Sequence, residues 1–347
     1  MAQLRDTHRR IVLASRPQGA PVETNFRLEV QHPPQPAEGE ILLRTVWLSL
    51  DPYMRGRMSD APSYVPPIAI DAVMGASTIA RVEKSRHAGF KEGEWVVSQN
   101  GWQDFALSDG RSLQRLPDAA CKHPSWALSL LGMTGFTAYM GLLDIGQPQA
   151  GETVVVAAAT GAVGSVVGQI ARLKGCHVIG IAGGAEKCHF AEQTLGFDRC
   201  LDHRDPALAE QLRRYCPDGI DVYFENVGGK VFDAVLPLMN PRGRIPLCGL
   251  IADYNAITPS TLPDRLPSLQ GALLRKRLRV QGFIINQDYP HRFDEFIHQM
   301  AQWVTEKRII MREDIYDGLD NAPKIFIDML EGRNFGKVVV RVAPDQP

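Results

Sequence analysis

The middle of the chain alternates short apolar segments with segments whose apolar residues recur at helical spacing. From about residue 150 to residue 290 this alternation predicts strands joined by helices. The expected strands are Thr153–Ala159, His177–Ala182, Arg199–Asp202, Val222–Asn226, Gly243–Gly249 and Arg279–Asn286. Helices are expected at 163–174, 185–195, 206–215 and 229–239. Almost continuously apolar strands are typical of a parallel sheet covered on both faces, so the pattern predicts a doubly wound α/β domain.

The segments before and after this region have a different pattern of apolar and polar residues. Short runs of alternating apolar and polar residues, separated by prolines and glycines, predict an irregular all-β domain before about residue 124. Its expected strands are 9–13, 26–30, 41–50, 77–82 and 95–98. A helix-like segment interrupted by Gly132 and Gly135 is expected at 125–140. Later in the chain, helices are expected at 292–306 and 321–331, and strands at 309–315 and 337–342. Because these last two strands have no glycine turn or partner helix, we expect them to rejoin the N-terminal domain.

Length and composition narrow the class of protein. The 347 residues exceed the about 100–200 residues of one ordinary domain, which predicts two domains. Hydrophobic residues make up 44% and charged residues 22%, and the formal net charge is -1. This charge balance gives no excess of positive charge that would favour nucleic acid or acidic lipid as a partner. Two uncharged runs, 124–143 and 153–171, are better explained as buried core than as membrane spans, because glycines or a tight turn interrupt them.

The cysteines carry no metal or disulfide signature. They stand singly at positions 121, 176, 188, 200, 216 and 248, without a CxxC pair or a close Cys/His cluster. This spacing argues against structural zinc and against a disulfide framework. The segment Met1–Arg10 leads into only a short apolar patch and does not resemble a signal peptide. We therefore expect reduced thiols in a cytoplasmic protein.

A glycine-rich turn lies between the first strand and the first helix of the α/β region. It runs from Ala159 to Gly164, with alanine in the first place of the G-x-G-x-x-G dinucleotide fingerprint. Glycine at positions 161 and 164 lets the backbone approach a pyrophosphate, and the N–H groups that open the following helix point at that anion. The turn predicts a dinucleotide site. The alternative is a tight strand-to-helix turn in an unrelated doubly wound domain.

The end of the second strand indicates which dinucleotide fits. NAD sites usually present an Asp or Glu about 20 residues past the glycines, where it binds the ribose. Here Gly183 and Gly184 occupy that place, and Lys187 follows them. The missing acid leaves room for a 2′-phosphate and Lys187 supplies the counter-charge, which predicts NADPH/NADP+. The alternative for Lys187 is a solvated lysine in the first turn of a helix.

Longer motifs resemble one protein family. They are LDPYMR at 50–55, GMTGFTAY at 132–139, AATGAVGSVVGQ at 158–169, YFENVGG at 223–229, CGLIADYN at 248–255 and GRNFGK at 332–337. Together they resemble the zinc-free branch of the medium-chain dehydrogenase/reductase superfamily. That branch contains the leukotriene B4 dehydrogenases, prostaglandin reductases and alkenal double-bond reductases. The resemblance spans nearly the whole chain, and within the branch it is greatest to the bacterial NADPH-dependent curcumin reductase type.

The positions that hold zinc in other branches agree with this resemblance. Zinc-binding members carry a cysteine after the strand that ends near Leu50, and a Gly-His-Glu after the next loop. This chain has Asp51-Pro52-Tyr53 and Met74-Gly75-Ala76 there, without a thiol or an imidazole. A glycine pair that is usual after the methionine is replaced by Gly75-Ala76-Ser77, which is a departure from the branch.

The resemblance implies domains and cofactor contacts. It implies an all-β GroES-like catalytic domain at 1–128, an NADP-binding Rossmann domain at 129–290 and a C-terminal return to the catalytic domain at 291–347. The residues implied to bind the cofactor are Gly161, Ala162, Val163, Gly164, Lys187, His203, Asn226, Cys248, Gly249, Leu250, Tyr254, Phe283, Ile284, Ile285 and Asn334. His203 replaces a tyrosine that relatives carry near the adenosine, and an ordinary surface histidine is its alternative.

The resemblance also implies a reaction, the reduction of the C=C bond of an α,β-unsaturated carbonyl compound. Hydride goes to the β-carbon, and without a metal a hydroxyl group must stabilise the enolate that forms. Tyr254 follows the fifth strand and is the first candidate for that hydroxyl; the nicotinamide ribose hydroxyl is the alternative donor. Tyr53 and Tyr64 are the next candidates, for substrate contact. For each tyrosine, packing at the edge of the core is the alternative.

Two rival functions share the fold and the cofactor. A zinc-free quinone oxidoreductase would reduce benzoquinone but not alkenals or enones, and a non-catalytic NADPH-binding protein would oxidise no cofactor with either. A zinc alcohol dehydrogenase is disfavoured by the missing ligands. The strand at 279–286 is expected at an edge of the sheet, where relatives pair as two-fold dimers, so we expect a homodimer. Apart from a second copy, we expect only a small-molecule partner, neither nucleic acid nor membrane.

Overall fold

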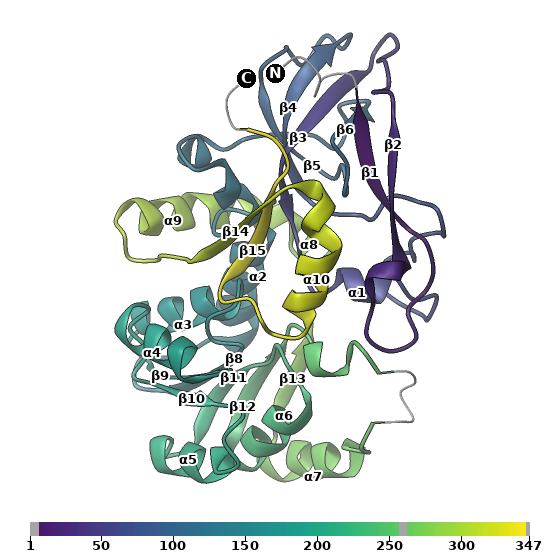
Figure 1. Ribbon diagram of the computed structural model, residues 1–347. Coiled ribbons are helices and arrows are strands. Elements are labelled where there is room, and N and C mark those ends of the chain that lie inside the picture. The colour runs from purple at the N-terminus through teal and green to yellow at the C-terminus, as the bar shows by residue number, and fades with distance from the viewer. Residues whose placement is uncertain (1–6, 257–261, 345–347) are drawn as a thin grey trace. The chain divides into compact units, whose positions relative to one another are not determined.

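The computed structural model describes residues 7–256 and 262–344 (Figure 1). The described residues fall into two compact units. Within the described residues, unit 1 comprises 7–128, 313–334 and 338–344, and unit 2 comprises 129–312, without its undescribed stretch, and 335–337. Unit 1 is therefore discontinuous in sequence. The predicted domain boundary at residue 291 differs from this division, because residues 291–312 lie in unit 2.

The described part of unit 2 is built on a six-stranded parallel sheet with the strand order β10-β9-β8-β11-β12-β13. Its strands are β8 (Thr153–Ala157), β9 (His177–Ala182), β10 (Arg199–Asp202), β11 (Ile220–Phe224), β12 (Met239–Leu247) and β13 (Arg279–Gly282). The chain starts at the central β8 and winds outward on each side in turn, so the strand order reverses between β8 and β11. This arrangement confirms the predicted doubly wound fold, with β13 at an edge.

Helices cover both faces of this sheet (Figure 1). One face carries α5 (Leu208–Tyr215), α6 (Gly229–Val235) and α7 (Leu266–Lys276), whose apolar residues join Val155 and Ala157 of β8 in one buried cluster. The other face carries α3 (Gly164–Leu173) and α4 (Ala185–Gln193), together with the π-helical turn η5 (Gly141–Gly146) that follows α2 (Met133–Met140). Alternate residues of each strand therefore point into two separate layers of core.

The helix α9 (Phe293–Thr305) completes unit 2 by packing on α2. Its rings Phe293 and Phe296 lie against Phe136 of α2, with ring centroids 5.4 and 5.0 Å apart. In the part of the chain that the structure describes, no helix is long and apolar enough to cross a membrane.

The described part of unit 1 contains a seven-stranded, mainly antiparallel sheet and a two-stranded ribbon. The sheet order is β14-β15-β3-β4-β5-β7, and β6 also pairs with β3. The strands are β3 (Ile41–Ser49), β4 (Thr78–Ser85), β5 (Trp95–Ser98), β6 (Phe105–Ser108), β7 (Gln114–Arg115), β14 (Glu313–Asp317) and β15 (Lys337–Arg341). The ribbon pairs β1 (His8–Leu13) with β2 (Phe26–Gln31). This confirms the predicted all-β class, and the C-terminal strands extend a sheet begun by N-terminal ones.

An aromatic cluster forms the centre of the unit 1 core. Phe26 of β2 stacks on Trp102, and both rings meet Phe326 of α10 (Ala322–Leu330), with centroids 5.5 to 6.3 Å apart. The short helix α1 (Met54–Arg57) lies against the same core through Met54. The C-terminal segment is thus an integral part of this core.

Some element predictions were wrong. The helix-like segment expected at 125–140 is interrupted at Gly132, as predicted, since Gly132 is extended between the 3-10 turn η4 (Pro124–Leu128) and α2. The second interruption, expected at Gly135, is absent because Gly135 lies inside α2. The strand expected at 309–315 begins only at Glu313, because the backbone of Ile310 is held by the side-chain amide of Gln169. The last parallel strand ends at Gly282, since the short helix α8 (Ile285–Asp288) follows it. Helix α7 was not predicted, although the proline in its first turn is compatible with a helix.

Candidate active site

The predicted glycine turn lies at the carboxyl end of β8, where the strand order of the sheet reverses. Ligands of doubly wound sheets bind at this point. The chain turns sharply at Ala158, whose φ is +53°, and the N–H of Gly161 donates to the Ala158 carbonyl at 2.9 Å. Helix α3 then begins at Gly164. Strand, turn and helix are therefore adjacent, as the dinucleotide fingerprint requires.

Gly164 makes a backbone contact that excludes a side chain. A Cβ atom at this position would lie 2.9 Å from the carbonyl carbon of Ala158 and 3.1 Å from the oxygen of Ala157, and it would overlap the Ala158 oxygen. A Cβ on Gly161 would lie 3.2 Å from that same Ala158 oxygen. At Gly161 and Gly164 the turn thus presents only backbone, next to the start of α3. Such a cradle fits a pyrophosphate.

Two polar side chains fix the turn and its helix within unit 2. The hydroxyl of Thr160 donates to the carbonyl of Phe335 at 3.1 Å. The amide of Gln169, in the middle of α3, donates to the Ile310 carbonyl at 2.8 Å and accepts from the Ile310 N–H at 2.9 Å. The N–H groups that open α3 therefore sit on a helix that is anchored at its start and in its middle.

A basic cluster surrounds Gly183 and Gly184 at the end of β9. A Cβ on Gly183 would lie 2.8 Å from Nε2 of His203 and 3.3 Å from Nη2 of Arg204, and one on Gly184 would lie 3.3 Å from Nη1 of Arg204. Partial burial lowers the pKa of His203, and the positive charges of Arg204 and Lys187 lower it further. We call Lys187, His203 and Arg204 the basic cluster. It lies where an NAD site presents an acid.

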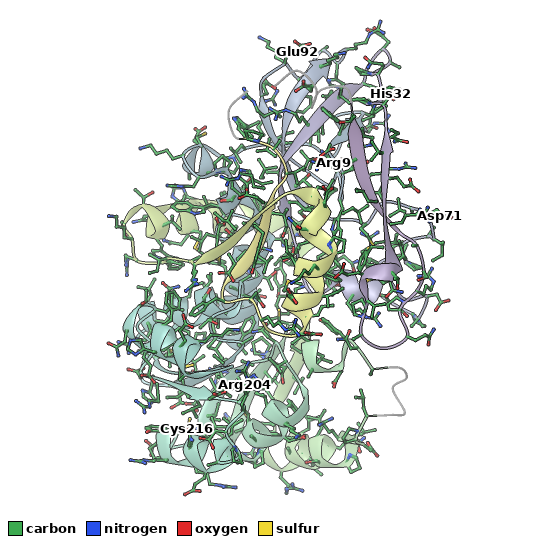
Figure 2. All side chains as sticks on the ribbon, in the orientation of Figure 1. Arg9, His32, Asp71, Glu92, Arg204 and Cys216 are labelled. Carbon is green, nitrogen blue, oxygen red and sulfur yellow. The ribbon has the colours of Figure 1, made fainter. Side chains whose placement is uncertain are left out.

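The sequence did not identify Arg204, which Figure 2 labels in unit 2 just beyond β10. Its position depends on Asp202, whose carboxylate accepts the N–H of Arg204 at 3.0 Å and also the N–H of Gly184. Partial burial opposes ionisation, but these hydrogen bonds outweigh it and lower the pKa of Asp202. The ionised carboxylate thus ties the loop after β10 to the glycine pair after β9.

The ends of β11 and β12 carry residues predicted to meet the nicotinamide half of the cofactor. Asn226 Nδ2 donates to the Ala157 carbonyl at 2.8 Å, across the point where the strand order reverses, which leaves the amide oxygen as the acceptor of this side chain. The carbonyl of Glu225 accepts the N–H groups of Cys248 and Gly249 at 2.9 and 3.2 Å. Burial raises the pKa of the Cys248 thiol to about 12, so it is protonated at neutral pH.

Tyr254 folds back over the end of β12. The 3-10 turn η7 (Ile251–Asp253) reverses the chain, and the Tyr254 hydroxyl accepts the N–H of Leu250 at 3.4 Å. A Cβ on Gly249 would lie 3.2 Å from that hydroxyl oxygen. The side chain is half-buried. Its hydroxyl therefore lies at the carboxyl edge of the sheet, the edge that also carries the glycine turn and Asn226.

Phe283 contributes its ring to the core. A Cβ on Gly141 would lie 2.6 Å from this ring, which also pairs with Tyr289 at 6.4 Å between centroids. Ile284 follows, with its N–H bonded to the Asp288 carboxylate at 2.7 Å, and Ile285 is buried at the start of α8. A cofactor contact at Phe283 would therefore use its main chain rather than its ring.

Three predicted residues, Tyr53, Tyr64 and Asn334, belong to unit 1. Tyr53 directly precedes α1, and burial, helped by the charge of Asp51, raises the pKa of its hydroxyl. Tyr64 acts electrostatically on Tyr53 and is itself 48% exposed. Asn334 lies between α10 and β15. Unit 1 therefore brings two tyrosines together, one half-buried and one exposed.

The segments that hold zinc in other branches contain the buried residues Asp51 and Met74. The Asp51 carboxylate accepts the hydroxyl proton of Ser49, and the Met74 carbonyl accepts the N–H of Trp102 at 2.8 Å. Among residues 7–256 and 262–344, no group of three or more His, Cys, Asp or Glu side chains is placed to hold a metal ion.

Segments of both units match models of known protein families. Residues 9–116 match the family model described as the N-terminal domain of oxidoreductase, and residues 162–302 match the one described as zinc-binding dehydrogenase. The NADPH-dependent curcumin reductase of Escherichia coli (strain K12) is 61% identical over 345 residues, 99% of this chain and 100% of that one. Prostaglandin reductase 1 of Mus musculus is 40% identical over 327 residues, 93% of this chain and 96% of that one.

A solved structure matches over nearly the whole chain as well. It is that of CurA in complex with NADPH from Vibrio vulnificus, with a TM-score of 0.94 at 60% sequence identity, covering 97% of this chain and 99% of that one. The glycine turn and the other site motifs thus lie in a chain that matches these three proteins over 93–99% of its length. The chain belongs to the medium-chain dehydrogenase/reductase family, as its motifs predicted.

Proposed function

We propose that this protein is an NADPH-dependent reductase of the C=C bond of α,β-unsaturated carbonyl compounds, including alkenals, enones and curcumin-like substrates. The observation that carries the proposal is the 61% identity, over 99% of the chain, to an NADPH-dependent curcumin reductase. The backbone cradle at Gly164 and the basic cluster beside Gly183 support it, because together they suit a pyrophosphate and a 2′-phosphate.

Different residues of unit 2 bind different parts of the cofactor. Gly161, Ala162, Val163 and Gly164 hold the pyrophosphate, and the basic cluster holds the 2′-phosphate, with Arg204 added to the residues predicted from sequence. Asn226 and the segment 248–254 hold the nicotinamide half, with the main chain of 283–285 beside it. Bound NADPH supplies a hydride to the β-carbon of the substrate. Asn334 remains a further proposed cofactor contact.

The protein's own groups stabilise the charge that appears on the substrate oxygen. The Tyr254 hydroxyl donates a hydrogen bond to the carbonyl oxygen and binds the enolate more tightly than the ground state. The Cys248 thiol, with its pKa raised to about 12 by burial, does not compete as a nucleophile for the electrophilic substrate. Tyr53 and Tyr64 remain the next candidates for substrate contact.

We also propose a cytoplasmic homodimer. The described part of β13 lies at the edge of the parallel sheet, with Arg279 and Gln281 exposed. An edge strand presents unpaired backbone groups to a second chain, and two-fold pairing of such edges would continue the sheet.

A substrate screen tests the proposed function. NADPH oxidation is followed with 2-alkenals, aryl enones, curcuminoids and benzoquinone, and the products are identified by mass spectrometry. The proposal requires saturated carbonyl products from the first three classes. Turnover of benzoquinone alone would identify a quinone oxidoreductase, and NADPH binding without any oxidation would identify a non-catalytic binding protein.

Reversal of the charge at Lys187 should separate the two nicotinamide cofactors. Lys187→Glu should weaken NADPH binding by about 1.5–3 kcal/mol, the strength of a charge-assisted contact, and leave NADH binding unchanged. Arg204→Ala should likewise weaken NADPH binding and leave NADH binding unchanged. Fluorescence titration with each cofactor measures both effects. Arg213→Glu, an equal charge reversal on the exposed face of α5, is the matched control. If Lys187→Glu weakened both cofactors equally, Lys187 would act through folding instead.

A further inference from the structure

Glu225 is a carboxylate buried at the carboxyl edge of the parallel sheet. It directly follows β11, and none of its surface is exposed. Its Oε1 accepts the N–H of Val227 at 2.6 Å and the N–H of Gly228 at 2.9 Å. Burial raises the pKa of this carboxyl group, and the two N–H groups oppose that rise. Because a buried carboxyl group is costly without donors, these two hydrogen bonds tie its side chain to the turn 226–229.

The turn 226–229 is bonded to the segment that carries Tyr254. The carbonyl of Asn226 accepts the N–H of Ile251 at 3.4 Å, and the carbonyl of Val227 accepts the N–H of Ala252 at 3.0 Å. Both donors belong to the 3-10 turn η7, and Tyr254 directly follows it. The carboxylate of Glu225 is therefore linked to Tyr254 through one layer of backbone.

Close packing leaves this link little freedom. Gly228 has a φ of +76° and Gly229 a φ of +56°, which glycine adopts without strain. A Cβ on Gly228 would lie 3.0 Å from a methyl carbon of Leu250, and a Cβ on Gly229 would lie 3.2 Å from the Cβ of Ala252. A displacement of the turn 226–229 therefore displaces η7 as well.

The main chain of Glu225 holds the beginning of the same segment. Its N–H donates to the carbonyl of Pro246 at 3.0 Å, and its carbonyl accepts the N–H groups of Cys248 and Gly249. The hydroxyl of Tyr254 lies beside Gly249, at 3.2 Å from the place of its missing Cβ. One residue thus holds the start of the segment 248–254 directly and its middle through the turn.

We propose that Glu225 is a positioning residue, whose carboxylate holds the turn 226–229 and thereby sets the place of the Tyr254 hydroxyl. The positional link requires only the hydrogen bonds described above, whereas its effect on the reaction rests on the proposed function. The side-chain amide of Asn226 is anchored separately, on the Ala157 carbonyl. Cofactor binding therefore does not depend on the Glu225 carboxylate.

Hydrogen–deuterium exchange of the full-length protein, read by mass spectrometry, tests the positional link. Glu225→Met keeps an unbranched side chain of similar size and removes the acceptor, whereas Glu225→Gln keeps an acceptor oxygen. Glu225→Met should accelerate exchange in the peptides that cover 226–229 and 248–254, and Glu225→Gln should retain wild-type protection. If Glu225→Met does not fold, Glu225→Asp, whose carboxylate is retracted by a methylene group, should show the same acceleration.

Asp221→Leu is the matched control for the exchange experiment. Asp221 lies at the opposite end of β11, where its carboxylate accepts the N–H of Thr153 at 2.9 Å. Its loss should leave exchange at 226–229 and 248–254 unchanged. Wild-type exchange at 248–254 in a folded Glu225→Met protein would overturn the proposal, and so would an equal acceleration in Asp221→Leu.

Single-turnover oxidation of NADPH by an enone tests the effect on the reaction. Glu225→Met should lower this rate at least about tenfold, since a misplacement of about 1 Å can cost a factor of about 10². NADPH affinity should stay at the wild-type value, and Glu225→Gln should recover the rate. In a Tyr254→Phe background, Glu225→Met should change the rate by less than about twofold, because no hydroxyl is left to position.

The two experiments separate failure of this proposal from failure of the proposed function. Equal rate losses with and without the Tyr254 hydroxyl would overturn the positioning role, and so would a loss of NADPH affinity that accounts for the slower rate. If the wild-type protein oxidised no NADPH with an enone, the proposed function would fail instead. The exchange experiment would then still decide whether Glu225 holds the segment of Tyr254.

Discussion

Tyr254→Phe should lower turnover of an enone by about 100-fold or more while NADPH affinity stays the same. Loss of one hydrogen-bond donor to a developing oxyanion typically costs a factor of about 10²–10³ in kcat. The hydroxyl lies beside Gly249 and Leu250 at the carboxyl edge of the sheet, and phenylalanine keeps the ring that folds over this turn. The effect should therefore fall on the chemical step and not on the fold or on cofactor binding.

Single-turnover oxidation of NADPH by an enone measures this step, and fluorescence titration measures NADPH binding in the same variant. Tyr215→Phe, on α5 of the same unit, is the matched control and should leave both quantities unchanged. If Tyr254→Phe kept the wild-type rate, the tyrosine would have no part in the mechanism, and the nicotinamide ribose hydroxyl would remain as the donor.

Gly164→Ala should abolish measurable NADPH binding and lower the free energy of unfolding by about 1–3 kcal/mol, the usual cost of overpacking. The added methyl group overlaps the carbonyl oxygen of Ala158, and that oxygen belongs to the backbone, so no side-chain rotation relieves the clash. The first turn of α3 must move away from β8. Its N–H groups then no longer converge on a pyrophosphate.

Urea unfolding and NADPH titration of this variant separate stability from binding. Gly56→Ala is the matched control, because a Cβ at Gly56 meets no atom within 4 Å and should leave both measurements near the wild-type values. A folded Gly164→Ala variant with wild-type NADPH affinity would show that the turn does not hold the pyrophosphate.

The parallel sheet was predictable because burial on both faces leaves a direct pattern in the sequence. Strands such as β8 and β9 are almost purely apolar, and alternating helices are implied by the apolar spacing between them. The strand expected at 309–315 failed for a reason that no local pattern contains. Its apolar residues resemble a strand, but the amide of Gln169, more than a hundred residues earlier, holds the backbone of Ile310.

The candidate site was predictable where it depends on backbone. Gly161 and Gly164 are conspicuous in sequence because close approach excludes a side chain, and the structure places both against Ala158. Arg204 was not predictable, since it reaches Gly183 only because β10 lies beside β9.

Transfer of deuterium from NADPH labelled at C4 of the nicotinamide tests the central claim most directly. The protein is given an aryl enone and labelled NADPH, and the product is examined by NMR and mass spectrometry. The proposed reduction predicts a saturated ketone with one deuterium on the former β-carbon. An allylic alcohol with deuterium on the carbonyl carbon, or a product without deuterium, would contradict it.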